Sequence, residues 1–579
     1  MNERQLGPLR DADNAARIFF AQAARADLRD LPRAMIAIGD GNWQQMTWGA
    51  MASRVECLAA FLIQRGLDKD SKVAVLADTR LEWGLAGLAA LAARAVLVPV
   101  YPTLVGESLV HSLAHSDARV LFVETEDQLH RVLGVWGRLG IQTLIGFEPL
   151  DAARLAEDMG LEGAAIASCC FTLAQAEELG AATLRIAPEL VSRRIDAIRL
   201  DDVGYLIYTS GTTGMPKGVQ LSHRNIAVNA GDWIALNGPL LHEGDVDVLW
   251  LPMSHIFGWG QFGLGNQLGF VTYFSQPLKA LEHLQALSPQ VFMSVPAYWE
   301  KLALTAWAFS ADPVAQQAEL RRLTGGRLRF CLSGGAGLGR EVKELFRAAG
   351  MMIVEGYGLT ECAPTLTMNR IDDYDFDSVG KPFPNVRLKI ADDGEILAKG
   401  DNLFVGYYKD AAATAAMYDA EGWFRTGDLG RFNERGFLQI IGRKKDILVT
   451  SGGKNIPPEN IELHFCGDPL ISRVLVYGDG RKYLTALVDI EEQAALARLR
   501  EHGAASVDSP RRHPLVHQWV QDRINAVNME LARYETIKRF CIADEPLTTE
   551  GGFLTPSLKV KRSQVYERYR TALEALYEA

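Results

Sequence analysis

Short apolar runs alternate with amphipathic stretches through the first third of the chain. The pattern predicts a helix over residues 43–66, with Thr47 as its N-cap. One apolar face of this helix consists of Met51, Val55, Leu58, Ala59 and Leu62. Strands are predicted at residues 73–76, 95–100, 119–123 and 143–146. This alternation is typical of an α/β fold in which helices connect the strands of a sheet.

The same alternation resumes after residues 150–201, which are rich in Ala and Glu and carry no motif. Further strands are predicted at residues 204–208, 246–251, 270–274, 291–295, 328–333 and 352–357. Several end in a polar or Gly-rich cluster, and ligands of open α/β sheets bind at such carboxyl ends. From residue 386 short strands and turns prevail. From residue 445 a smaller unit is expected, with a hairpin over 474–489 and helices over 493–502 and 514–531.

Composition narrows the class of protein. A chain of 579 residues with 48% hydrophobic and 23% charged residues is typical of a soluble protein with several domains. The net charge of −11 argues against nucleic acid as the main partner. Residues 1–13 are too polar for a secretory signal. The most apolar stretch, residues 84–101, is interrupted by Arg94 and Pro99 and predicts a buried helix and a strand, although peripheral membrane attachment stays open.

The seven cysteines are scattered, without metal-ligand spacing or a catalytic pattern. Reduced thiols in a cytoplasmic protein are the simplest interpretation.

The most informative stretch follows the strand predicted at residues 204–208. It reads Tyr-Thr-Ser-Gly-Thr-Thr-Gly-Met-Pro-Lys-Gly-Val over residues 208–219. One interpretation is a Gly-rich surface turn. The other is a phosphate loop, in which backbone amides and hydroxyls approach polyphosphate and Lys217 adds positive charge. It is not of the Walker type, because Pro216 precedes the lysine and Gly218 follows it.

Further candidate chemistry lies downstream. In residues 355–361, Tyr357 offers an aromatic face on which a flat ring could stack, Thr360 offers a hydroxyl, and Glu361 offers a hard oxygen ligand suited to Mg²⁺. Asp428 is either a turn residue or an acceptor for ribose hydroxyls. Four other segments could be functional or purely structural. The structural interpretation is a core histidine for residues 251–257, a strand-to-helix turn for 333–337, and a solvated basic run for 442–446 and 554–562.

Together these motifs, in this order across residues 208–562, resemble the adenylate-forming superfamily of acyl-CoA synthetases, luciferases and peptide-synthetase adenylation domains. Residues 294–302, the Gly-Gly-Lys-Asn-Ile loop at 452–456 and residues 566–569 are most similar to bacterial long-chain fatty acyl-CoA synthetases. The resemblance implies a large N-terminal domain, residues 1–444, of layered α/β sheets with a distorted β-barrel subdomain. It implies a small, mobile α+β C-terminal domain at residues 445–579.

The resemblance also implies roles for individual residues. Catalytic roles fall on Lys559, Thr360, Glu361, Arg443 and His255. ATP and AMP would be bound by Thr209, Ser210, Gly211, Thr212, Thr213, Gly214, Lys217, Gly335, Ala336, Glu355, Gly356, Tyr357, Thr360, Asp428 and Arg443. Thr209 and Glu361 would hold Mg²⁺, Lys445 would be the hinge, and Gly452 and Gly453 would face coenzyme A. His255 and Trp259 would line the acyl tunnel, although a structural core tryptophan is the alternative for Trp259.

The implied function is ATP-dependent ligation of a medium- or long-chain fatty acid to coenzyme A through an acyl adenylate. ATP, Mg²⁺ and coenzyme A are the expected cofactors and substrates, in a cytoplasmic monomer or homodimer that is open to attachment at the inner face of the membrane. An acyl-AMP ligase that serves a carrier protein, an aryl or short-chain ligase, and a non-catalytic sensor are the alternatives. A short segment between residues 302 and 328, and Arg94 where a glycine is usual, depart from the pattern and affect the prediction of substrate specificity.

Overall fold

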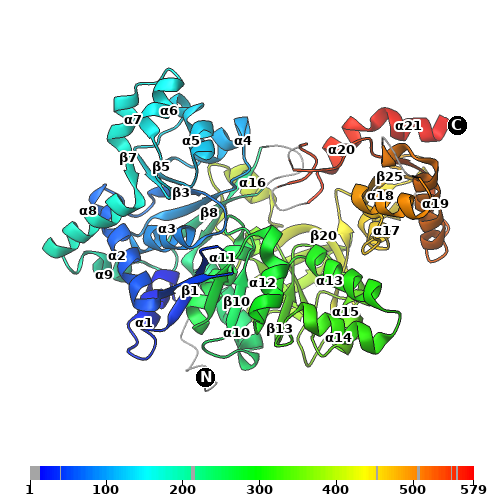
Figure 1. Ribbon diagram of the computed structural model, residues 1–579, viewed down its shortest axis with the longest axis horizontal. Coiled ribbons are helices and arrows are strands. Elements are labelled where there is room, and N and C mark those ends of the chain that lie inside the picture. The colour runs from blue at the N-terminus through cyan, green and yellow to red at the C-terminus, as the bar shows by residue number, and fades with distance from the viewer. Residues whose placement is uncertain are drawn as a thin grey trace.

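The computed structural model describes residues 13–39, 41–209, 215–451, 454–504, 509–549, 551–555 and 559–578. Five of the expected phosphate-loop residues, Ser210 to Gly214, and the two glycines Gly452 and Gly453 lie outside this part. Two large sheets and a four-stranded sheet form the body of the chain. The last part of the chain, coloured orange and red in Figure 1, forms a smaller lobe beside it.

The first large sheet has eight strands, and its inner strands β3, β4, β5 and β6 pair in parallel. Its order is β19 (Gly406–Tyr407), β9 (Lys217–Ser222), β8 (Val203–Thr209), β4 (Val96–Val100), β3 (Lys72–Leu76), β5 (Ala118–Val123), β6 (Thr143–Gly146) and β7 (Cys170–Thr172). The strands predicted for this sheet are confirmed to within one residue at each end. The β8 and β9 strands are antiparallel, so the phosphate-loop sequence joins the two strands of a hairpin.

The second large sheet has nine strands. Its order is β16 (Lys381–Pro382), β15 (Thr365–Met368), β14 (Ile353–Gly358), β13 (Phe330–Ser333), β12 (Val291–Ser294), β10 (Val246–Leu249), β11 (Val271–Phe274), β1 (Pro32–Ala37) and β2 (Trp43–Thr47). All five strands predicted in this region are present, each within two residues of the expected bounds. The four-stranded sheet contains β17 (Arg387–Ile390), β18 (Glu395–Lys399), β20 (Phe424–Phe432) and β21 (Leu438–Arg443).

The helix predicted over residues 43–66 is shorter than expected. Thr47 is its N-cap and accepts a hydrogen bond from Ala50 N, so α2 covers Trp48–Gln64. Residues 43–47 form β2 instead, paired antiparallel with β1, because the backbone before a cap is extended and free to join a sheet. The motif-free stretch 150–201 is ordered and contains α6 (Ala152–Asp158), α7 (Gly163–Cys169), β7, α8 (Leu173–Ile186) and α9 (Leu190–Ala197).

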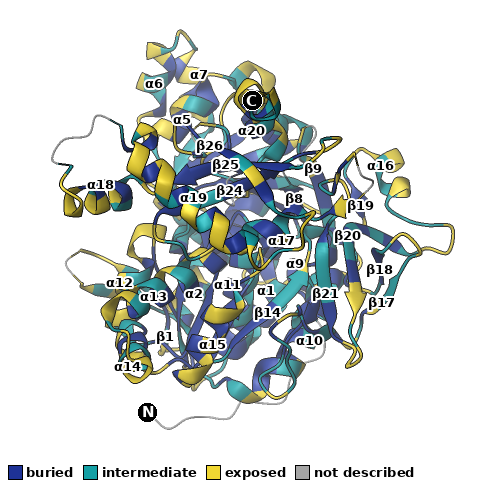
Figure 2. Cartoon of the chain, turned by 90° about the vertical axis from the view of Figure 1, so that its right-hand side faces the viewer, coloured by how far each residue is buried: buried dark blue, intermediate teal, exposed yellow. Residues whose placement is uncertain are grey.

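One hydrophobic core lies between the two large sheets, and helices of both are packed into it. It includes α3 (Leu81–Ala92) and α11 (Ile256–Leu268), whose residues are largely buried. The other helices of the body are α1 (Ala15–Ala23), α4 (Gly106–Val110), α5 (Glu126–Leu133), α10 (His223–Asn237), α12 (Ala280–Leu287), α13 (Pro296–Phe309), α14 (Pro313–Leu323), α15 (Arg340–Ala348) and α16 (Ala411–Ala416). Figure 2 shows buried strands beneath helices that are exposed on their outer sides.

The smaller lobe has cores of its own, made of residues between 448 and 573. The predicted hairpin is present as β24 (Ile471–Tyr477) and β25 (Leu484–Ile490), and β26 (Ile537–Ile542) pairs with β25 in parallel. A two-stranded ladder of β22 (Leu448–Val449) and β23 (Asn455–Ile456) precedes them. The helices are α17 (Pro458–Leu463), α18 (Glu492–Glu501), α19 (Pro514–Asn528), α20 (Arg562–Arg568) and α21 (Arg570–Glu578). Across the described residues, no helix combines the length and apolarity that crossing a membrane requires.

Candidate active site

The two ends of the phosphate-loop sequence are held in register. Thr209 is the last residue of β8 and lies opposite Lys217, the first residue of β9. At the foot of the loop the Pro216 carbonyl is 2.8 Å from Nε2 of His111, and the hydroxyl of Tyr208 is 2.8 Å from Nδ1 of His115. The strands therefore fix where the loop begins and ends, and they place the Thr209 hydroxyl beside the exposed Lys217.

The Gly-rich turn at residues 334–337 follows β13 and is held by Glu355. Gly335 has φ of +92°, a left-handed conformation that favours glycine. Leu338 N–H donates to Glu355 Oε1 at 2.8 Å, and the buried Lys343 ammonium forms an ion pair with the same carboxylate. Gly335 and Ala336 are exposed at this turn. Glu355, predicted to bind nucleotide, thus uses its carboxylate to hold the turn that presents Gly335 and Ala336.

Three predicted nucleotide residues meet at the edge of β14 and the four-stranded sheet. The Tyr357 hydroxyl donates to Asp428 Oδ2 at 2.5 Å, and Arg443 Nε lies 2.9 Å from Asp428 Oδ1. Burial raises the pKa of Asp428, and this effect is opposed by Arg443. Asp428 and Arg443 face each other directly in the β20–β21 ladder. Gly356, on β14 next to Tyr357, opposes Met368 in β15, and a Cβ there would lie 3.2 Å from the Thr367 carbonyl oxygen.

Thr360 and Glu361 form a short turn straight after β14. The Tyr407 hydroxyl donates to Glu361 Oε1 at 2.8 Å. Lys217 Nζ lies 4.7 Å from the centroid of the same Tyr407 ring. Through this tyrosine, the lysine of the phosphate loop and the expected metal ligand Glu361 belong to one cluster.

The oxygen atoms of this cluster fit a Mg²⁺ ion that arrives with ATP. Glu361 and Thr209 offer hard oxygen ligands, and Mg²⁺ in proteins usually combines one or two such ligands with substrate phosphates. In the part of the chain that the structure describes, no group of three or more His, Cys, Asp or Glu could hold a metal alone. The metal roles of both residues remain predictions.

Lys559 reaches this cluster from the smaller lobe. Leu554 and Val560 form an antiparallel bridge, and Thr555 N–H donates to the Lys559 carbonyl at 2.7 Å, so the backbone of Lys559 is held next to Thr555. Lys559 is exposed to solvent, although protein atoms of the site surround part of the side chain. The resulting desolvation and Arg443 lower the pKa of Lys559, while Asp428, Glu459 and Glu361 act in the opposite direction.

His255 caps α11, with Nδ1 accepting a hydrogen bond from Phe257 N–H at 3.1 Å. Burial, together with Lys559, lowers its pKa to about 4, so the imidazole is neutral at pH 7. It therefore interacts with Lys559, the residue predicted to be catalytic, without adding positive charge.

An apolar cavity of about 120 Å³ begins beside this cap and runs between α10 and α11. Trp259, Ile256 and Phe257 line it, with Trp233 from α10 and Tyr205 from β8. Trp259 is 4% exposed and packs against Trp83, Phe262 and Tyr205 at ring-centroid distances of 5.3, 5.5 and 6.4 Å. Trp259 is therefore both a core residue and a wall of the predicted acyl tunnel, whereas His255 lies next to the lining residues.

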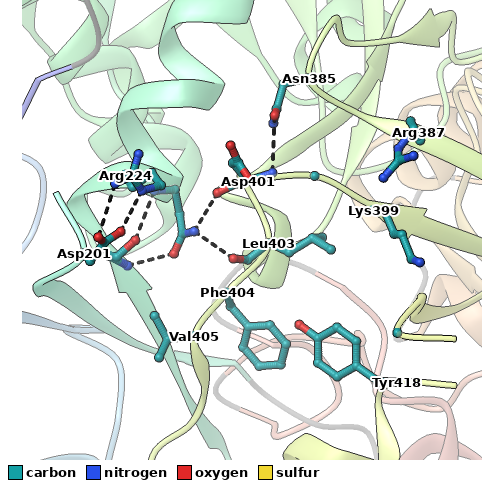
Figure 3. Close-up of a pocket in the computed structure, with 14 residues that line it drawn as sticks. Asp201, Arg224, Asn385, Arg387, Lys399, Asp401, Leu403, Phe404, Val405 and Tyr418 are labelled. Carbon is teal, nitrogen blue, oxygen red and sulfur yellow. Dashed lines mark hydrogen bonds and ion pairs between the residues drawn. The ribbon is translucent and has the colours of Figure 1, made fainter. Parts of the chain in front are cut away.

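A larger pocket of about 730 Å³ lies between residues 399–405 and the start of α10 (Figure 3). Its rim is polar: Arg224 is bonded to Asp201, and Asn225 donates to the carbonyls of Asp401 and Leu403. The residues that line it include none of the predicted site residues. Its link to the site is one wall, residues 401–405, because Phe404 N–H donates to the Glu361 carbonyl at 2.8 Å.

The connection between the lobes is sharply defined. Lys444 belongs to the body, since its ammonium lies 2.6 Å from Asp393 and 3.0 Å from Glu395 and its N–H donates to the Gly427 carbonyl. Lys445 comes next and precedes the first strand of the smaller lobe. The predicted hinge thus lies directly after an anchored residue.

Two residues of this site escaped the sequence reasoning. Lys343 and Tyr407 have no motif of their own, because their partners lie 12 and 46 positions away in the chain. For Lys343, the only available signal was that this lysine occupies a position on the buried face of α15.

Comparison with known proteins agrees with this arrangement. Residues 23–408 match the model of the AMP-binding enzymes, and residues 445–579 match the model of the AMP-binding enzyme C-terminal domain. The chain is 32% identical to the long-chain-fatty-acid–CoA ligase FadD15 of Mycobacterium tuberculosis, over 98% of this chain and 97% of that protein. It is 28% identical to the long-chain-fatty-acid–CoA ligase 5 of Rattus norvegicus, over 93% and 85%.

The fold is similar to that of the adenylation domain of a carboxylic acid reductase from Segniliparus rugosus, solved with AMP and a co-purified carboxylic acid. The TM-score is 0.79 at 20% sequence identity, with 98% of this chain and 95% of that domain covered. The family matches cover both the body and the smaller lobe. The chain therefore belongs to the AMP-binding enzymes of the adenylate-forming superfamily.

Proposed function

We propose that this protein joins a medium- or long-chain fatty acid to coenzyme A in two steps that share one site. In the first step the carboxylate attacks the α-phosphorus of ATP, giving acyl-AMP and pyrophosphate. In the second step the thiol of coenzyme A attacks the acyl carbon, giving the thioester and AMP. The long-chain-fatty-acid–CoA ligases that match nearly the whole chain support this activity.

The observation that carries the proposal is the position of Lys559. It interacts electrostatically with Arg443, Asp428 and Glu361, and with His255, which lies next to the residues that line the apolar cavity. Adenylation brings two anions together, so the site must supply positive charge. Lys559 and Arg443 would supply it to the carboxylate and the α-phosphate, and Lys217 to the outer phosphates. Mg²⁺, held by Glu361, Thr209 and phosphate oxygens, would neutralise further negative charge.

The nucleotide itself would lie where β14 of the nine-stranded sheet meets the four-stranded sheet. Tyr357 supports an aromatic base beside the Gly335 turn, and Asp428 accepts hydrogen bonds from ribose hydroxyls. Thr360 donates to the α-phosphate. The loop residues Ser210 to Gly214 lie outside the described residues and keep their predicted role of binding the phosphates of ATP.

The acid would enter the cavity between α10 and α11. Ligand pockets usually measure roughly 300–1,000 Å³, whereas this cavity measures about 120 Å³. A fatty acid therefore has to displace side chains, and the two largest that line the cavity are Trp259 and Trp233. Trp259 lies nearer in the chain to His255, which caps the same helix. We infer that movement of Trp259 admits the acyl chain.

We further propose that residues 1–444 and 445–579 are separate domains joined at Lys445. The second half-reaction would use a rotation of the smaller domain that withdraws Lys559 and brings Gly452 and Gly453 to the thiol. We also propose a cytoplasmic location, which is in keeping with seven free cysteines, for a monomer or homodimer with the option of peripheral membrane contact.

The test is pyrophosphate release with ATP and Mg²⁺ across acids from acetate to oleate, with and without coenzyme A. Wild type should prefer long acids and need coenzyme A for turnover. Lys559→Ala should lower adenylation by roughly 10²–10³-fold, as expected for loss of one charged transition-state contact. Slow release that is indifferent to coenzyme A would indicate an acyl-AMP ligase. A preference for aryl or short-chain acids would indicate a different class of acid substrate. Absence of pyrophosphate release with every acid would refute the proposed ligase activity.

A further inference from the structure

The Glu361 turn is fastened along its length by a neighbouring segment, residues 402–407. Phe404 N–H donates to the Glu361 carbonyl at 2.8 Å. Asn402 Nδ2 donates to the carbonyls of Cys362 and Thr365, at 2.8 and 3.1 Å. The far side of this segment lines the pocket of Figure 3, where the Phe404 ring lies beside Tyr418. These hydrogen bonds all go to backbone carbonyls, so the backbone of the turn is held in place without the Glu361 side chain.

Tyr407 ends this segment and is itself held firmly. It is the second residue of β19 and pairs with Val219 in β9, two residues after Lys217. Its N–H donates to Thr414 Oγ1 at 2.8 Å, and its ring packs edge-on against Phe404 at a centroid distance of 5.0 Å. Only 7% of the residue is exposed. Its ring and hydroxyl consequently have one position in the site.

Each part of this side chain contacts a different half of the predicted MgATP site. The hydroxyl donates to Glu361 Oε1 at 2.8 Å, which leaves Oε2 for another partner. The ring face carries the Lys217 ammonium at 4.7 Å from its centroid. We propose that Tyr407 is a positioning residue that fixes the Glu361 carboxylate for the metal and the Lys217 ammonium for the phosphates. This inference rests on the proposed function for the roles of Glu361 and Lys217.

The physical reason lies in how weakly each group would otherwise be oriented. A glutamate ligand can rotate about its terminal bonds, and hydrogen bonds to metal-binding carboxylates typically hold metal affinity or activity about 10–100-fold higher than without them. A lysine has a long flexible stem, and an ammonium over an aromatic face gains roughly 0.5–1 kcal/mol at exposed sites. One rigid ring thus orders two flexible groups that bind the same ligand.

The test measures ATP binding by calorimetry, without acid or coenzyme A, in EDTA and over a series of Mg²⁺ concentrations. Tyr407→Phe keeps the ring and removes the hydroxyl. It should leave ATP affinity in EDTA unchanged and raise the Mg²⁺ concentration for half-maximal effect about tenfold. Tyr407→Leu removes both contacts, so it should also weaken binding in EDTA, by roughly two- to fivefold.

Tyr408→Phe is the matched control, because that neighbouring hydroxyl donates to Asp117 Oδ2 at 2.7 Å, away from Glu361. It should reproduce the wild-type titration. A wild-type Mg²⁺ dependence in Tyr407→Phe would overturn the proposal, and so would equal effects of the two Phe variants. An equal loss of ATP affinity with and without Mg²⁺ in Tyr407→Phe would also overturn it, by pointing to general damage. Wild type that binds MgATP but releases no pyrophosphate would refute the proposed function and leave this titration valid.

Discussion

At the scale of single residues, the turn that presents Gly335 and Ala336 depends on a buried ion pair. The side chains of Lys343 and Glu355 are 4% and 5% exposed. The Lys343 ammonium also donates to the Phe376 carbonyl at 2.5 Å, and Glu355 accepts from Leu338 N–H. Burying two charges is unfavourable unless each is fully paired, and here both are.

Breaking this pair should be costly. Lys343→Met leaves the Glu355 charge buried without its cation, and such losses typically lower the free energy of unfolding by about 3–5 kcal/mol. The double variant Lys343→Met/Glu355→Gln keeps an acceptor for Leu338 and removes the charge, so it should recover a large part of that loss. Chemical denaturation of both variants checks this. Equal destabilisation in the single and double variants would show that the charge is unimportant.

Trp259 gives a second prediction at this scale. A Cβ at Gly87 would lie 2.8 Å from Cη2 of the Trp259 ring, so the ring occupies space that only glycine leaves free. Trp259→Phe should therefore enlarge the cavity and change the ratio of kcat/KM for oleate to that for hexanoate by about tenfold or more. Trp259→Ala would remove more of the core, at about 3–5 kcal/mol, so the Phe variant is preferred. If the stable Trp259→Phe variant kept the wild-type ratio of kcat/KM for the two acids, Trp259 would not be a gate.

At the scale of elements, α10 connects the hairpin of the predicted phosphate loop to the apolar cavity. Ser222 caps it, with its hydroxyl accepting from Asn225 N–H at 3.2 Å. His223 is the first helical residue and is 3% exposed, and its ring fills the space where a Cβ at Gly204 would lie 2.7 Å from Cε1. Among the described residues, its Nδ1 atom has no hydrogen-bond partner. A charged imidazole is poorly solvated there.

This burial predicts an acid-sensitive stability. Burial lowers the pKa of His223 to about 4, with Asp202 and Asp13 opposing the effect. Above about pH 6.5 the imidazole is neutral in both the folded and the unfolded chain, so the free energy of unfolding is not lowered by this group. As the pH falls from about 6.5 to about 4, the unfolded chain binds a proton that the folded chain does not. The free energy of unfolding therefore falls progressively, by a total of about 3 kcal/mol. His223→Gln should flatten the unfolding free energy between pH 6.5 and 4, and an unchanged slope in that variant would contradict the assignment.

At the scale of the whole molecule, the two lobes meet around the site. Leu463 of the smaller lobe approaches Gly337, where a Cβ would lie 3.6 Å from Leu463 Cδ1. Glu300 on α13 interacts electrostatically with Arg473 of β24. These contacts bring the lobes together with Lys559 at the predicted site, which is the arrangement that the proposed adenylation step would need. The chain passes between the lobes directly after Lys444, which three contacts hold to the body.

A hinge at this point predicts that the two half-reactions can be separated. Lys445→Pro restricts the backbone rotation of one residue and leaves Lys559 in place. Acid-dependent pyrophosphate release in a single turnover should be retained, while thioester formation should fall at least roughly tenfold, or about 1.4 kcal/mol. Lys444→Pro would disturb the anchored residue and the Gly427 hydrogen bond, so it serves as a comparison. Equal loss of both half-reactions in Lys445→Pro would argue against the hinge.

The sequence by itself determined the elements and the family. Hydrophobic periodicity and caps act over a few residues, so the strands of both large sheets and the start of α2 at Thr47 could be predicted. It also marked Arg94 as unusual, and the structure gives the reason. Arg94 has φ of +64°, a conformation that favours glycine, and its guanidinium pairs with Asp202 at 3.1 Å.

Only the tertiary structure decided which residues meet. Residues 43–47 became a strand because β1 offered a pairing edge. Glu355 faces Lys343, and Tyr407 links Lys217 to Glu361, through contacts between distant segments that no local pattern encodes. Lys559 reaches Arg443 and Asp428 only in this arrangement of the two lobes. Local periodicity fixes elements, whereas the position of a side chain in a site depends on packing between elements that are far apart in the chain.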